Sequence, residues 1–134
     1  MNEGTLDSIQ AARARVAAQV AEAETRNAAV ARLADDVSAL TVRIASPRGE
    51  VTVTASPTGR VVQVSLTSAA ETLAAAALSQ LVTDTVARAQ HSAAMAAVQR
   101  SAELLGEHSP FVVQLRDDAE STFPDRGSGA IGYR

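Results

Sequence analysis

Three short runs of alternating apolar and polar residues lie in the middle of the chain, between two long helical patterns. Apolar side chains recur at every second position of each run, which is typical of strands with one buried face. The alternation predicts that Val53 and Val64 lie on the buried face and that Gln63 points outward. The three runs are Leu40–Ala45, Val51–Ala55 and Arg60–Leu66.

Two segments with turn chemistry, at positions 46–49 and 56–59, separate these runs, and both read Ser-Pro-X-Gly. Proline fixes φ and glycine adopts a positive φ at little cost, so both segments suit tight turns. Connections this short force neighbouring strands to pair antiparallel. The sequence therefore predicts a three-stranded antiparallel meander with one apolar face.

The pattern before the meander predicts one long helix. It should begin near Thr5 or Asp7 and continue to about Ala39, because no Gly or Pro interrupts Leu6–Ala45. Such a helix is ~45 Å or more in length at 1.5 Å per residue, whereas the strands span only ~20 Å. The helix should therefore extend beyond its own sheet, and its apolar positions need a second partner.

Heptad spacing counted from Leu6 places an apolar residue at every d position, whereas Arg13 and Asn27 interrupt the a positions. A polar Asn at an a position fixes the register of a coiled coil. We expect a seam with a second copy of the chain; the alternative is an amphipathic helix that packs only on its own sheet. The seam residues would be Ile9, Val16, Val20, Ala23, Asn27 and Val30.

Two further helices are expected after the meander. Ser68 and Glu71 have the spacing of a capping box, so a long helix should run from Ser68 to Leu105. Gly106 stands where a left-handed C-terminal cap is expected. A Ser-Pro pair at 109–110 begins a short helix with the stripe Phe111, Leu115 and Ala119.

The fold class is therefore α+β, in the order α-β-β-β-α with a short additional C-terminal helix. The chain is expected to form a homodimer, because both the extended helix and the exposed sheet edges require a partner. The expected organisation is one domain at 1–106, the short helix within 107–123 and a disordered tail at 124–134.

Composition excludes several classes of function. The 134 residues carry a formal net charge of −3, contain no Lys, and lack Cys, which excludes disulfides and thiolate metal sites. No apolar run reaches the roughly 20 residues that cross a bilayer, and no signal-peptide pattern begins the chain. We therefore expect a cytoplasmic protein without a membrane partner.

Catalytic and cofactor motifs are missing, so an enzyme is not expected. No nucleophile elbow, phosphate-binding loop or dinucleotide fingerprint is present. The two histidines, His91 and His108, lack a nearby set of metal-ligating residues, and His91 is expected on a solvated polar face. We expect no catalytic residue, no metal, no cofactor and no small-molecule substrate.

Arginine is the charged residue that suggests a function, because it binds phosphate in a bidentate manner. Residues 1–66 carry seven Arg and seven acidic residues, whereas residues 67–134 carry five Arg and eight acidic residues. A DNA-binding surface would thus use the N-terminal half. The candidate residues are Arg13, Arg15, Arg26, Arg32, Arg48 and Arg60.

The order of motifs from Leu6 to Leu105 resembles the YbaB/EbfC family of small bacterial nucleoid-associated proteins. A long helix precedes Gly-Glu-Val-Thr-Val at 49–53, and Gly59 precedes a strand that reads VVQVSL. The next helix carries Leu78, Leu81 and Val82. The Arg-only, Ala-rich composition is similar to that of actinobacterial proteins, among which some family members are associated with type VII secretion loci.

The resemblance implies a homodimer that binds DNA with little sequence preference and associates with the nucleoid. The acidic balance of the chain leaves a second function open. In that alternative the protein is an interaction adaptor or regulator, for instance linked to a type VII secretion system, that has kept the fold without DNA binding.

Overall fold

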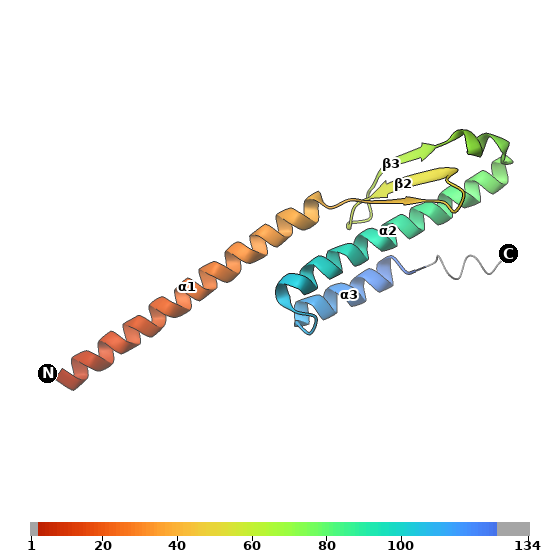
Figure 1. The fold of residues 1–134 in the computed structure, drawn as a ribbon. Coiled ribbons are helices and arrows are strands. Elements are labelled where there is room, and N and C mark those ends of the chain that lie inside the picture. The colour runs from red at the N-terminus through yellow and green to blue at the C-terminus, as the bar shows by residue number, and fades with distance from the viewer. Residues whose placement is uncertain (1–2, 126–134) are drawn as a thin grey trace. The chain divides into compact units, whose positions relative to one another are not determined.

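The computed structural model describes residues 3–125, and the chain divides into two units, residues 1–35 and 36–134. The expected α+β order is confirmed (Figure 1). The predicted tail at 124–134 lies outside the described residues from position 126 onward. The elements are α1 (Glu3–Ala39), β1 (Val42–Ala45), β2 (Val51–Ala55), β3 (Val61–Leu66), the 3₁₀ turn η1 (Ser68–Thr72), α2 (Ala75–Leu105) and α3 (Pro110–Thr122).

Helix α1 accounts for nearly all of the first unit. Twelve of its 37 residues are alanine, the strongest helix former. It begins at Glu3, slightly before the predicted start, and the acidic side chain of Glu3 suits the positive N-terminal end of the helix dipole. It ends at Ala39, as predicted, and its last four residues belong to the second unit.

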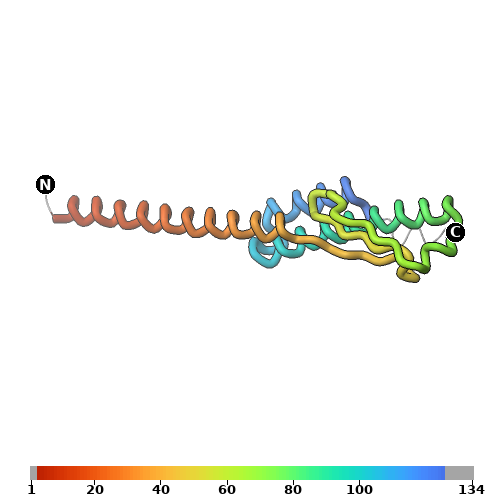
Figure 2. Tube along the Cα trace, turned by 90° about the horizontal axis from the view of Figure 1, so that it is seen from above, coloured from red at the N-terminus to blue at the C-terminus, as the bar shows by residue number. Residues whose placement is uncertain are grey.

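The sheet is the antiparallel meander that the sequence predicts, with strand order β1-β2-β3. Figure 2 shows the three strands side by side. The amide of Gly49 donates to the Ser46 carbonyl oxygen at 2.9 Å, and the amide of Gly59 donates to the Ser56 carbonyl oxygen at 3.0 Å. Both glycines have positive φ, +74° and +92°, as the turn segments require.

The main core lies between the sheet and α2. Val51, Val53 and Ala55 of β2 are fully buried against Ala89 and Ala93 of α2. Alanine at these two helical positions lets the helix backbone approach the sheet closely, so valine side chains fill the space between them. Helix α2 packs on β1 and β2, and in Figure 1 it lies along one face of the sheet.

The predicted burial of Val64 is wrong, although its predicted face is right. Val64 lies directly opposite Val53 on β2, so the two side chains share a face. Val64 is nevertheless 43% exposed, because α2 covers β1 and β2 and leaves β3 at the edge. An irregularity at Thr54/Ala55 also places Val61, rather than Val62, opposite Ala55.

The predicted capping box at Ser68 is also wrong. Residues 68–72 form the 3₁₀ turn η1, and α2 begins only at Ala75 after an extended Leu73 and Ala74. The preceding residue, Thr67, takes the N-cap position and bonds to the turn between β1 and β2 instead of capping a helix. Its amide donates to the Glu50 carbonyl oxygen at 3.0 Å, and its hydroxyl donates to the Gly49 carbonyl oxygen at 2.8 Å.

Helix α3 packs on α2 and forms a second core. Pro110 begins the helix, as predicted. Leu115 and Ala119 of the predicted stripe pack in this core, but Phe111 is 55% exposed and its neighbour Val112 is fully buried instead. The core residues are Ala94, Val98, Ala102, Val112 and Ala119. At the end of α2, Gly106 has the expected positive φ of 90°, but its ψ of 145° is not that of a left-handed cap.

Phe123, which directly follows α3, contacts both α2 and the turn between β2 and β3. The Nδ1–H of His91 donates to the Phe123 carbonyl oxygen at 2.7 Å; since a carbonyl only accepts, Nδ1 carries the proton. The Phe123 ring lies against Gly59, and Gln90 donates to the Gly59 carbonyl oxygen at 2.8 Å. His91 is thus half-buried in a structural contact, and its predicted place on a solvated face is wrong.

Candidate nucleic-acid interface

The face of the sheet opposite α2 is polar. Pairing places Arg43 of β1, Thr54 of β2 and Gln63 of β3 in one row across the strands. Strand alternation turns these residues away from Ile44, Val53 and Val64, which form the next row on the α2 side. Within residues 36–125, Figure 1 shows no helix over this polar face, which we call the outer face.

The six candidate arginines from the sequence are all exposed, and they are divided between the two units. Arg48 and Arg60 lie in the two hairpin turns, at opposite ends of the sheet. The other four, Arg13, Arg15, Arg26 and Arg32, lie on α1 in the first unit. Arg43 is also exposed. It is not among the six candidates, although the alternation of residues 40–45 predicts it on the polar face.

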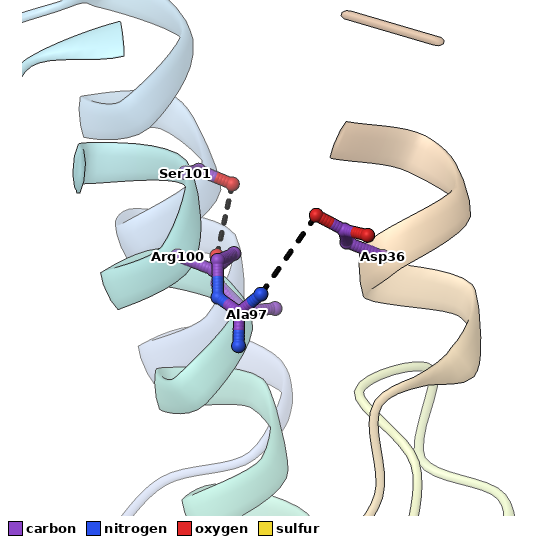
Figure 3. Close-up of polar contacts among 4 residues, drawn as sticks. All are labelled: Asp36, Ala97, Arg100 and Ser101. Carbon is purple, nitrogen blue, oxygen red and sulfur yellow. Dashed lines mark hydrogen bonds and ion pairs between the residues drawn. The ribbon is translucent and has the colours of Figure 1, made fainter. Parts of the chain in front are cut away.

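Arg100 has a different environment from these arginines. Its Nη1 lies 3.8 Å from Oδ2 of Asp36, at the last turn of α1 (Figure 3). Both side chains are about half exposed, at 48% and 50%, so the pair contributes little to stability. The adjacent buried hydroxyl of Ser101 donates to the Ala97 carbonyl oxygen at 2.9 Å.

Glu50 is the acidic residue of the sheet segment, and the first turn holds its carboxylate in place. The Ser46 hydroxyl donates to Oε1 of Glu50 at 2.8 Å, and the same hydroxyl accepts the Val51 amide at 3.0 Å. Backbone N–H donation from Glu50 itself, followed by the Ser46 hydroxyl, lowers the pKa of this carboxyl below its ordinary value. The hydrogen-bonded carboxylate therefore stabilises the first turn.

Glu50→Gln should make the stability of the fold less dependent on pH. A folded-state pKa below the unfolded value contributes stability above the unfolded pKa, and this stability is lost as pH falls through the folded pKa. We expect wild type to melt above the variant at pH 7 and this difference to shrink below about pH 4.5. Thermal melts between pH 7 and 3 measure it; a constant difference would contradict the electrostatic origin.

The predicted seam residues lie along α1 and are largely exposed. Ile9, Val16, Val20 and Val30 expose between 41% and 57% of their surface. Asn27 is exposed and Ala23 is half-buried. The helix thus carries a regularly spaced set of uncovered apolar side chains.

Residues 3–125 contain no group of three or more His, Cys, Asp or Glu side chains that could hold a metal ion. No helix within the same range is long and apolar enough to span a bilayer.

The chain is a small α+β protein in which one long helix precedes an antiparallel meander and a second long helix follows it. Comparison with protein families matches residues 7–108 to the YbaB/EbfC DNA-binding family. The match covers most of the chain, so the chain belongs to this family, which is a DNA-binding and not an enzyme family. Helix α3 lies beyond the matched residues. Comparisons with curated proteins and with solved structures find no significant match.

Proposed function

We propose that this protein is a nucleoid-associated, dimeric DNA-binding protein that contacts phosphates through arginine and reads little sequence. The observation that carries the proposal is the family match over residues 7–108. Phosphate contacts fix a protein on the duplex without reading bases, and guanidinium groups suit phosphate geometry. The proposed contacts are Arg13, Arg15, Arg26, Arg32, Arg48 and Arg60, all of which are exposed.

Two uncovered apolar surfaces support a dimer. Strand β3 is an edge strand with four exposed apolar residues: Val61, Val62, Val64 and Leu66. An exposed apolar edge strand favours pairing with another chain. The second surface is the proposed α1 seam, formed by Ile9, Val16, Val20, Ala23, Asn27 and Val30. Two-fold symmetry, the commonest in homo-oligomers, would cover each surface with a second copy.

The test of DNA binding is affinity for random duplex DNA at roughly 50 and 200 mM salt, for wild type and for Arg26→Ala/Arg32→Ala. Each lost phosphate contact should lower the slope of log affinity against log salt by about 0.9. We therefore expect the double variant to lose about 2 units of slope and to bind all sequences more weakly.

Absence of wild-type binding at 50 mM salt would overturn the DNA function. Binding that responds neither to salt nor to the double variant would overturn phosphate contact through these arginines. If wild type does not bind DNA, the adaptor function stands first, and the acidic C-terminal helix favours it as the alternative. Residues 110–125 carry one arginine and four acidic residues, a composition that repels DNA and suits a protein partner.

A further inference from the structure

The two faces of the sheet differ in chemistry, and the difference determines what each can bind. On the α2 side, the uncovered part of the sheet is the apolar edge at β3. On the outer face, the paired rows are Arg43–Thr54–Gln63 and Ala45–Thr52–Ser65, and neither contains an acidic residue. The first surface suits burial against a second protein chain, whereas the second surface suits a hydrated, negatively charged partner.

The distribution of charge along the chain also favours the outer face as the binding site for an anionic partner. Residues 40–67 carry three arginines and one acidic residue, Glu50. That carboxylate is buried in the first turn, where it accepts the Ser46 hydroxyl. Helix α1 instead carries four arginines and six acidic residues, and residues 68–109 carry two arginines and four acidic residues. The sheet is therefore the one described segment with a positive charge balance, and its positive charge is not offset on the outer face.

We propose that the outer face of the sheet binds the sugar-phosphate backbone of duplex DNA, with Arg43 as its central contact. This inference rests on the proposed DNA-binding function and names the surface that carries it. Arg43 donates to a phosphate, and Thr54 on β2 and Gln63 on β3, which continue the row from Arg43 across the sheet, donate hydrogen bonds to neighbouring phosphate oxygens. Arg48 and Arg60 flank this row from the turns at the two ends of the sheet.

The geometry suits backbone contact. Adjacent strands lie about 4.8 Å apart, so the row from Arg43 to Gln63 is about 10 Å wide. The hydroxyl, amide and guanidinium groups of such a row would remain unsatisfied in a dry protein interface, at a cost for each. Phosphate oxygens and the water around them supply acceptors for all of these groups.

The sharpest test adds a single negative charge to this face without changing side-chain shape. Gln63→Glu is nearly isosteric and lies at an exposed position, so folding should be unaffected. Its matched control is Gln99→Glu, the same substitution at an exposed position of α2. We expect Gln63→Glu to weaken binding to random duplex DNA roughly three- to tenfold at 50 mM salt, and Gln99→Glu to change it less than twofold.

A second pair of variants removes positive charge. Arg43→Ala should lower the salt slope by about 0.9, the value for one phosphate contact. Arg116→Ala makes the same charge change on α3 and should leave the slope within error of wild type. Thermal melts of all four variants verify that each is folded.

Each outcome has a defined meaning. Wild-type DNA binding that neither Gln63→Glu nor Arg43→Ala weakens more than its control would overturn the outer-face site and leave the DNA function standing. Equal losses for both members of each pair would show a response to net charge alone and would also overturn the site. A wild type that does not bind duplex DNA at 50 mM salt would overturn the function and the site together.

Discussion

Val53→Asp is expected to unfold the sheet-helix unit. Val53 is fully buried between Ile44 and Val64 on the neighbouring strands and lies in the core beneath α2. A carboxylate at this position has no partner, and such a buried charge costs roughly 3–5 kcal/mol. This is a large part of the 5–15 kcal/mol that stabilises a typical domain. Circular dichroism should show a collapsed or absent melting transition at pH 7.

Val64→Asp is the matched control, because Val64 shares the face of Val53 in the paired position. With 43% of its surface exposed, the new carboxylate keeps its water, and the chain should remain folded. Self-association should be lost instead, so light scattering should give a mass near 13.8 kDa where wild type gives twice that value. Equal unfolding by both variants would contradict the exposed position of β3, and a wild-type monomer would contradict the dimer.

Gly59→Ala should destabilise the fold far more than Gly49→Ala. Both glycines have positive φ, which costs an alanine about 1–2 kcal/mol. A Cβ at Gly49 would meet nothing within 4 Å, but a Cβ at Gly59 would lie 2.7 Å from Cε1 of Phe123. Overpacking of this kind costs typically 1–3 kcal/mol in addition. Urea denaturation of the two variants should therefore separate them by at least about 1 kcal/mol.

Phe123→Ala provides the double-mutant test of that contact. If the Phe123 ring causes the excess penalty, the combined Gly59→Ala/Phe123→Ala variant should lose less stability than the two single variants added together. If the two losses of stability are strictly additive, the Phe123 ring does not contact Gly59 in solution. Backbone conformation alone then accounts for the loss of stability in Gly59→Ala.

The sequence predicts the strands well because their chemistry is local. Alternation and the two Ser-Pro-X-Gly turns determine pairing, so the sequence alone predicts that Val53 and Val64 share one face. Burial is not local: it depends on where α2 crosses the sheet, and this position is set by Ala89 and Ala93 packing on β2. The alternation along β3 therefore predicts a buried face, but it cannot show that α2 leaves this edge strand exposed.

Long-range hydrogen bonds explain the other errors. Thr67 bonds to the first turn eighteen residues earlier, and no local pattern at Ser68 reveals this. The contact between His91 and Phe123 spans 32 positions. In the candidate interface, the sequence identifies the arginines as candidates. It does not predict which of them form the site, because a face free of acidic residues forms only when three strands pair.

The position of α3 means that the second core of this protein extends beyond the residues that match the family. Family similarity stops at residue 108, yet Val112 and Ala119 complete the core over Ala94, Val98 and Ala102 of α2. A chain truncated where the family match ends would expose to water the apolar side of α2 that packs against α3.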